Sequence, residues 1–420
     1  MKYFLPVVGF LLIALPGLSQ RDCRSADYRQ QQLKADPSLA VSVEAVEQFT
    51  RLQLRKAAVT IDGQGGSKDN LPAVITIPVV VHILYNNSSQ NIPDAQVLSQ
   101  IEVLNADYGK HNADTAAIPA YYSPLAADCG FRFVLACVDT NGHATTGIIR
   151  KHTNAASFSI NDDVKYSSKG GDDAWDRDRY LNLWVCNLTG NILGYSSIPG
   201  GPRQTDGVVI LYTAFGTKGM AISPYNRGRT ATHETGHWLN LIHVWGDTDC
   251  GDDEVADTPP QKAATYGNPS GVIVSCGNTP YGNLYMDYMD FTDDIGMHLF
   301  TYGQKDRMRT LFVSGGFRQA LLSSDAGPVT TGIGNPVMPG AGDAAALDVY
   351  PNPARDVVTV KWQDGVREGS LLGVYDQLGR RLMLVRVTGT TLSLDLSKLS
   401  GGIYYIRLEG GKGNSRLVKL

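Results

Sequence analysis

The sequence predicts a mixed α/β domain followed by a small all-β sandwich. A β-branched run at residues 73–85 precedes a helical pattern at 94–108, as expected where helices pack on a sheet. Residues 325–346 are rich in Gly, Pro, Ala and Thr and show no periodicity, which is typical of a linker. Short alternating runs separated by Gly-containing turns then occupy residues 347–420.

The first 19 residues have the pattern of a secretory signal peptide. Lys2 gives a basic start, residues 4–15 are apolar, and small residues precede a cleavage that we expect after Ser19. No later stretch approaches the roughly 18 apolar residues of a membrane helix, so we expect no membrane span in the mature protein. It is therefore predicted to act outside the cytoplasm, where disulfides persist.

Residues 20–68 are predicted to form a removable pro-segment. Residues 29–56 are polar and charged with helical spacing, and a Gly-rich stretch follows at 62–68. We expect activation by cleavage between Arg51 and Lys68, because an exposed flexible segment is a preferred site of proteolysis.

Residues 69–324 form the predicted α/β domain. Its strand at 73–85 is followed by the helix at 94–108, whose apolar residues are Val97, Ile101 and Leu104. Further strands are expected at 131–138, 180–188 and 207–212, and a second helix at about 229–239. The net charge of −4 is mild and the basic residues are spread along the chain, which argues against a nucleic-acid-binding surface.

The second helix carries the motif His-Glu-Thr-Gly-His. His233 and His237 are four residues apart, so one helical face presents both imidazoles to one zinc ion. His243 supplies a third ligand, and three protein ligands leave one position open for water. Glu234 is displaced by about 100° around the helix from His233, which favours a general-base role over ligation. A structural zinc site would usually add a fourth ligand, commonly cysteine.

Six cysteines permit fifteen full pairings. Proximity to the histidine motif favours a disulfide between Cys250 and Cys276. The pairing of the other four stays open; they are Cys23, Cys129, Cys137 and Cys186.

Three segments resemble the pappalysin family of metzincins over roughly residues 73–320. They are residues 233–247, the acidic stretch at 250–261 and the Tyr-Met-Asp-rich segment before Phe300. The resemblance implies a metzincin catalytic domain of the α/β (α+β) class, with a twisted mixed sheet and a zinc-binding helix above a cleft and an irregular lower subdomain. It also implies a secreted zinc metalloendopeptidase that acts on protein or peptide substrates.

The sequence departs from the family pattern where the chain leaves the zinc helix. The glycine of the motif is Asn240 here, and asparagine is the non-glycine residue that best tolerates the left-handed conformation. The family's Met-turn, a methionine followed two residues later by tyrosine, is assigned to Met289 with Phe291, or alternatively to Met286 with Tyr288. The first assignment removes a hydroxyl that stabilises the oxyanion, unless Tyr288 replaces it.

Two further departures concern cysteines and substrate preference. Many relatives have a second disulfide whose cysteines fall near Asn268 and Gly296, and both cysteines are absent here. An aspartate that selects arginine in some relatives corresponds to Ile295, so the resemblance does not favour basic substrates.

Five carboxylates follow the histidine motif closely and would repel one another without a cation. We expect calcium, with Asp252, Asp253 and Asp257 as ligands, and a solvated acidic loop is the alternative. The other two carboxylates are Asp247 and Asp249.

Cys23 lies at the start of the pro-segment. Its thiolate could occupy the open zinc position and keep the precursor latent, as in the cysteine switch of related zymogens. The glycine that often follows such a cysteine is Arg24 here, and a disulfide or a spare thiol is the alternative.

Residues 347–420 resemble the type IX secretion sorting domain of Bacteroidetes bacteria. The resemblance rests on the runs at 349–353, 374–380 and 399–405. It implies that the type IX secretion machinery exports the protein to the cell surface or the medium. A carbohydrate-binding sandwich is the alternative, although no exposed row of aromatic residues favours it.

Two other functions compete with proteolysis. One is a catalytically weakened surface-binding protein of the same fold, and the other is a metal-stabilised adhesin. Glu234 distinguishes them from a protease, because neither binding role needs a general base beside the metal ligands.

Overall fold

The computed structural model describes residues 23–61, 71–327, 329–331, 335–337, 347–352, 354–362, 370–375, 381–387, 389–408 and 414–419. The predicted signal peptide and the Gly-rich stretch at 62–68 lie outside these ranges. No helix in the described ranges is long and apolar enough to cross a membrane.

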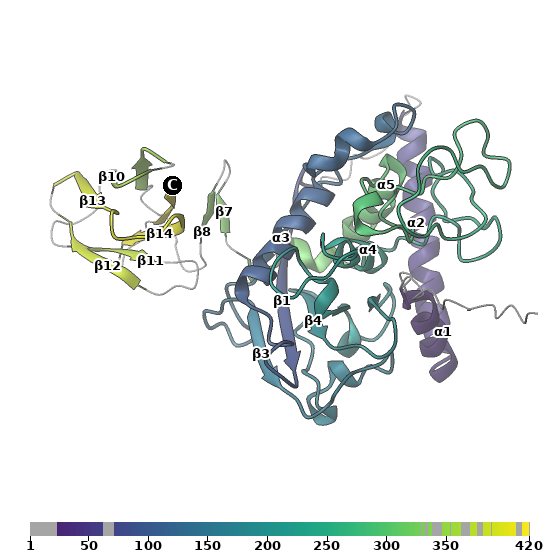
Figure 1. The fold of residues 1–420 in the computed structure, drawn as a ribbon, viewed down its shortest axis with the longest axis horizontal. Coiled ribbons are helices and arrows are strands. Elements are labelled where there is room, and N and C mark those ends of the chain that lie inside the picture. The colour runs from purple at the N-terminus through teal and green to yellow at the C-terminus, as the bar shows by residue number, and fades with distance from the viewer. Residues whose placement is uncertain are drawn as a thin grey trace, which may run out of the picture.

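The first helices in the described part of the chain are α1 (Ser25–Ala35) and α2 (Leu39–Ile61), both within the predicted pro-segment. Helix α1 contacts strand β5 (Gly194–Ser196), and α2 contacts helix α5 (Tyr302–Arg309). Figure 1 shows both helices in purple along one side of the α/β domain. These two helices therefore lie on the surface of the domain that follows them.

A sheet of six strands forms the centre of the α/β domain, in the order β2-β1-β4-β6-β5 with β3 also paired to β1. Its pairings are parallel except that of β5 with β6. Nearly every residue of β1 is buried, which explains its continuous apolar sequence. The other bounds are β1 (Ile75–Tyr85), β2 (Phe131–Leu135), β3 (Ile148–His152), β4 (Leu181–Cys186) and β6 (Val208–Leu211).

Helix α3 (Asp94–Tyr108) packs on β2 and on α4 (Arg229–Trp238). All ten residues of α4 are buried. From 239 to 301 the described chain has no α-helix or named strand, which is the irregular lower part expected for a metzincin. The 3-10 turns are Ala113–Ala117, Ser123–Leu125, Asp163–Lys165, Ser167–Lys169, Arg203–Thr205, Tyr212–Ala214, Asp294–Gly296, Thr310–Phe312 and Gln319–Ser323.

The C-terminal part has two antiparallel sheets, with strand orders β13-β10-β9 and β12-β11-β14-β15. Apolar residues from both sheets, including Val360 and Ile406, share one core, as in a sandwich. A hairpin of β7 (Val329–Thr331) and β8 (Asn335–Val337) lies within the predicted linker. The remaining bounds are β9 (Leu347–Tyr350), β10 (Val357–Trp362), β11 (Leu371–Tyr375), β12 (Arg381–Arg386), β13 (Thr391–Asp395), β14 (Gly402–Leu408) and β15 (Asn414–Lys419).

Candidate metal centre

Helix α4 and the turn after it bring three histidines together. His233 and His237 lie one turn apart on α4. Asn240 then adopts the left-handed conformation, with φ 75°, so the chain turns back sharply and His243 meets the helix. Arg307 Nε donates to the Asn240 carbonyl at 2.7 Å, which holds the turn in place.

The three imidazoles point their Nε2 atoms at one place. Nε2 of His237 lies 3.2 Å from that of His233 and 3.1 Å from that of His243. Each Nδ1 lies within hydrogen-bond distance of an acceptor: the Tyr288 carbonyl at 2.6 Å, the Leu241 carbonyl at 2.9 Å and Asp247 Oδ1 at 2.5 Å. When Nδ1 carries the proton, Nε2 presents a lone pair, which is the arrangement of metal-binding histidines. Burial, with the nearby His243, lowers the pKa of His237 to about 3 and keeps it neutral.

Cys23 completes this cluster from the pro-segment. Its Sγ lies 3.5 Å from His237 Nε2, and the four ligand atoms all lie within 4.8 Å of one another. Burial and the charge of Glu234 raise the pKa of the Cys23 thiol. Three imidazoles and one sulfur suit a tetrahedral transition-metal ion such as zinc. Across the described ranges, no other group of three or more His, Cys, Asp or Glu ligand atoms is as compact.

Glu234 lies beside the cluster and is covered by the pro-segment. The residue is 1% exposed, and its Oε2 accepts a hydrogen bond of 2.7 Å from Ser25 Oγ. Ser25 Oγ in turn accepts from the backbone N–H of Ser196 in β5, at 2.8 Å. A Cβ at Gly194 would lie 3.0 Å from Glu234 Cγ, so glycine leaves room for the Glu234 side chain.

The structure distinguishes the two assignments of the Met-turn. Met289 lies against α4, because a Cβ on Gly236 would come within 2.5 Å of its Sδ. Met286 belongs to a separate apolar cluster with Tyr122 and Leu284. The geometry therefore favours Met289.

Phe291 lies at the histidines, whereas the Tyr288 hydroxyl, predicted as a possible replacement for the catalytic hydroxyl, points to Arg229. The Phe291 ring centroid lies 5.7 Å from that of His233 and 4.9 Å from that of His243. The Tyr288 side chain is fully buried, and its hydroxyl accepts from Arg229 Nη1 at 2.7 Å. Arg229 is itself buried, and it is the backbone carbonyl of Tyr288 that lies 2.6 Å from His233 Nδ1.

The acidic residues after the motif do not converge on one point. Asp247 bonds His243, whereas Asp257 accepts from Thr301 Oγ1 at 2.7 Å and from the backbone N–H of Gly303 at 2.9 Å. Asp253 is buried, and its two carboxylate oxygens lie 2.8 and 2.9 Å from Thr258 Oγ1. Burial raises the pKa of Asp253 to about 7.

A disulfide joins Cys250 and Cys276, with the Cα atoms 5.7 Å apart. It links the acidic stretch to the segment before the Met-turn. The cysteines whose pairing the sequence left open are free and buried.

Sequence reasoning missed two members of the centre. Asp247 was grouped with the possible calcium ligands, yet its position four residues after His243 is a signal for a contact with that histidine. Ser25 gave no signal, because its contact with Glu234 spans 209 residues of chain.

Comparisons with known proteins give one family for the α/β domain and one for the sandwich. The peptidase M43 family, described as pregnancy-associated plasma protein-A, matches residues 165–313. The secretion system C-terminal sorting domain matches residues 348–420. An extracellular metalloprotease of Arthroderma otae is 33% identical over 248 residues, covering 57% of this chain and 78% of the relative. One of Pyricularia oryzae is 30% identical over 281 residues, covering 64% and 86%.

Solved structures also resemble this chain, over nearly their whole length. Mature mirolysin of Tannerella forsythia in complex with a cleaved peptide is 49% identical, with a TM-score of 0.59, and the match covers 60% of this chain and 97% of that one. A promirolysin mutant of the same organism is 44% identical, with a TM-score of 0.66, covering 72% and 97%.

Proposed function

Because this chain belongs to the pappalysin (peptidase M43) family, we propose that it is a zinc-dependent endopeptidase whose metal is held by His233, His237 and His243. The chain is a secreted or cell-surface metalloendopeptidase with a type IX sorting domain at residues 348–420. The proposal adds the identity of the metal, its ligands and the roles of the residues around it. We also propose that the type IX secretion machinery is the partner that recognises the sorting domain.

The convergence of the three Nε2 atoms is the observation that carries the proposal. The distances of 3.2 and 3.1 Å from His237 Nε2 to the other two Nε2 atoms would be unfavourable between protonated rings, but they suit neutral ligands around one cation. Each Nδ1 has its own acceptor, so each ring is oriented before the metal binds.

Glu234 is proposed as the general base. A zinc ion at the histidines would supply the Lewis acidity that activates water toward the scissile carbonyl. Glu234 follows the first ligand on α4, and its buried carboxylate would accept the proton of the attacking water and pass it to the leaving amine. Phe291 offers no hydroxyl to the developing oxyanion, so that hydrogen bond is absent. This last observation favours the second candidate, a catalytically weakened surface-binding protein.

The pro-segment is proposed to keep the precursor latent. Cys23 occupies the fourth position of the cluster, and Ser25 bonds the carboxylate of Glu234. Both groups needed to activate water are then engaged by one short segment. Removal of the pro-segment would release the metal position and the base together.

Calcium at the predicted ligands Asp252, Asp253 and Asp257 stays a proposal, and Asp253 is the ligand around which other oxygen atoms lie. The buried carboxylate faces the Thr258 hydroxyl, which also lies 2.8 Å from the Val255 carbonyl, so three oxygen types of a calcium site meet there. Removal of calcium with zinc retained should lower the melting temperature by about 5 °C, since a bound cation stabilises the folded state. Asp253→Asn should abolish this calcium dependence. An unchanged melting temperature would contradict the site.

The test of the proposed function is cleavage of denatured protein after removal of the pro-segment. Wild type, Glu234→Ala and the exposed control Glu102→Ala would be compared, with zinc content measured on each. We expect about one zinc in all three and cleavage by the wild type and the control only. If all three bind zinc and none cleaves, the binding-protein function replaces the proposal, and Phe291→Tyr becomes the variant to examine.

A further inference from the structure

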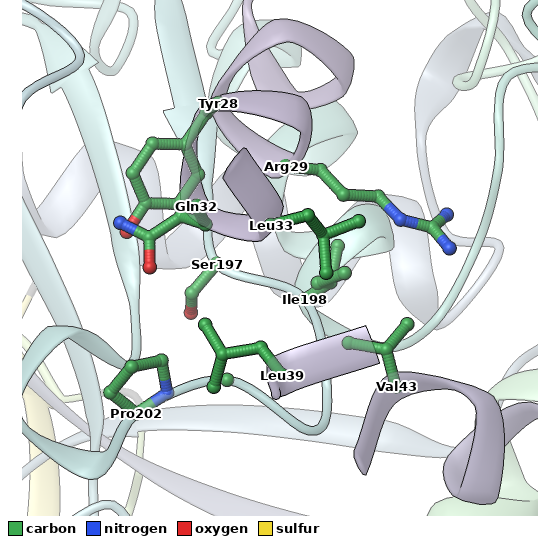
Figure 2. A pocket seen from close by; sticks show the side chains of 10 residues that line it. Tyr28, Arg29, Gln32, Leu33, Leu39, Val43, Ser197, Ile198 and Pro202 are labelled. Carbon is green, nitrogen blue, oxygen red and sulfur yellow. The ribbon is translucent and has the colours of Figure 1, made fainter. Parts of the chain in front are cut away.

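Helix α1 inserts one aromatic side chain into the α/β domain. Within this helix only Ser25 and Tyr28 are buried, and Tyr28 is 3% exposed. Figure 2 shows Tyr28 and Gln32 of α1 beside the loop that carries Ser197, Ile198 and Pro202. Tyr28 is therefore the large side chain that α1 buries most deeply.

The hydroxyl of Tyr28 lies between an anion and a cation. It donates to Asp162, with distances of 2.9 Å to Oδ1 and 2.8 Å to Oδ2, and it accepts from Lys165 Nζ at 3.1 Å. Its ring centroid lies 4.9 Å from that of Tyr195 and 4.7 Å from the same Nζ. Asp162 and Lys165 thus contact the hydroxyl, whereas Tyr195 and Lys165 contact the ring.

The charged and aromatic groups around the Tyr28 hydroxyl come from the α/β domain, and Gln32 of α1 also donates to Asp162 Oδ2 at 2.7 Å. Lys165 is fully buried and forms an ion pair of 2.9 Å with Asp162. Its Nζ also donates to the Thr205 carbonyl at 2.8 Å and lies 5.6 Å from the Trp184 ring centroid. Because the two charges already face each other, they stay paired when Tyr28 leaves. Loss of the pro-segment would expose a preformed polar and aromatic pocket.

The pocket lies next to the strand that borders the metal centre. Tyr195 is the middle residue of β5, and its neighbour Gly194 faces Glu234. The pro-segment runs along the same edge, since the backbone N–H of Arg24 donates to the Gly194 carbonyl at 3.1 Å. Successive side chains of a strand point to opposite faces of the sheet. A peptide added to this edge would direct alternate side chains toward Glu234 and toward the Tyr28 pocket.

We propose that, in the activated enzyme, the pocket formed by Asp162, Lys165 and Tyr195 is a substrate subsite that selects tyrosine. The inference rests on the proposed function and names a substrate class for it. A phenol satisfies the carboxylate and the ammonium at once, as Tyr28 does. A phenylalanine ring leaves both without that partner, and a basic side chain meets the charge of Lys165. The pro-segment then blocks this subsite in addition to the metal.

The experiment measures cleavage by the protein after removal of its pro-segment. A peptide library would identify the position at which tyrosine is enriched, and matched peptides with Tyr or Phe there would give a ratio of kcat/KM. We expect a ratio of about 10 for the wild type, falling to about 1 in the double variant Asp162→Asn with Lys165→Met. Tyr195→Phe keeps the ring of the pocket and should retain the preference. If the double variant fails to unfold cooperatively, Asp162→Asn alone replaces it.

Cleavage of both peptides at equal rates by the wild type would overturn the subsite and leave the proposed function intact. Absence of cleavage would overturn the proposed function. In that case, NMR would measure the binding of N-acetyl-tyrosinamide and of N-acetyl-phenylalaninamide to the activated protein. The two affinities would show whether the pocket prefers tyrosine. Tighter binding of the tyrosine compound, lost in the double variant, would support the pocket, and equal binding would refute it.

Discussion

The two helices of the pro-segment hold the α/β domain by different chemistry. The segment around α1 uses single polar atoms at the metal centre and its edge strand: Cys23 at the histidines, Ser25 at Glu234 and Tyr28 in its pocket. Helix α2 uses charged pairs away from the ligands. Glu47 accepts two hydrogen bonds from Arg307, at 2.9 and 2.6 Å. The contacts that cover the metal centre and the charged contacts of α2 are thus made by different residues.

The different contacts of α1 and α2 follow from where each helix lies on the α/β domain. Arg307, which binds Glu47, also donates to the carbonyl of Asn240, where the chain leaves α4. Asn240 Nδ2 in turn donates to Thr50 Oγ1 of α2 at 3.2 Å. Helix α2 is therefore docked on the turn that positions His243, whereas α1 is docked on the groups that would carry out the reaction.

The largest effect is expected from Cys23→Ser, which removes the sulfur from the cluster. The precursor should gain at least about tenfold in cleavage of a protein substrate, because the fourth metal position becomes accessible to water. Cys137→Ser replaces another buried cysteine, near Ala326, and should leave the precursor latent. A Cys23→Ser precursor as inactive as the control would show that the cysteine does not block the site.

Glu47→Gln should weaken anchoring without changing the cluster. Arg307 is 1% exposed in its side chain, so loss of the carboxylate leaves a buried charge and should cost about 3 kcal/mol in urea unfolding of the metal-free precursor. Glu44→Gln, an exposed change on the same helix, should cost little. Equal effects of the two substitutions would contradict a separate anchor.

The ion pair of Glu47 and Arg307 also predicts that the free energy of unfolding depends on pH. Burial raises the pKa of Glu47, but hydrogen bonds and the charge of Arg307 outweigh it and lower the pKa below 4.5. A lowered folded pKa makes this contribution complete above the ordinary carboxyl pKa and removes it as the pH falls through the folded value. Unfolding measured from pH 7 to pH 3 should show this loss in the wild type, and Glu47→Gln should lack it.

Ser25→Ala tests the contact of α1 with Glu234, and we expect a smaller loss of unfolding free energy than for Glu47→Gln. The change leaves the Glu234 carboxylate and the Ser196 N–H without the hydroxyl that joins them, and should cost about 2 kcal/mol in the same unfolding experiment. Ser42→Ala, exposed on α2, is the control. A cost no larger than that of the control would mean that Ser25 contributes nothing to docking.

Arg51→Gln should have the smallest effect. Arg51 and Glu254 are 2.7 Å apart, but their side chains are 42% and 33% exposed, so we expect about 0.5 kcal/mol. The difference from wild type should disappear at high salt, where exposed charges are screened. A cost as large as that of Glu47→Gln would place the main anchor at this pair.

The elements with strong local patterns were predicted well. The first strand, the helix at 94–108 and the helix at 229–238 begin and end within about two residues of their predicted positions, because apolar spacing or buried β-branched runs define them. Strand β5 was missed, since its three residues, Gly194 to Ser196, have no pattern of their own. Its place is set by pairing with β6.

The candidate site was predictable where its chemistry is local in sequence. The histidine spacing indicated a shared cluster, and the disulfide followed from proximity. The Tyr28 pocket and the Ser25 contact join residues more than 130 positions apart, so no sequence window contains them. The sequence places Tyr288 one residue from Met289 and so could not show that the fold turns its hydroxyl toward Arg229.

The covalent connection between the pro-segment and the sheet has a thermodynamic consequence. Helix α2 ends at Ile61 and β1 begins at Ile75, so an intact chain would keep the proposed inhibitory segment at a high effective concentration whatever the dilution. One cut between these elements turns the pro-segment into an ordinary bimolecular ligand whose occupancy depends on its free concentration. After export into a large external volume, dilution would lower the concentration of the cleaved segment, and the segment would dissociate from the enzyme.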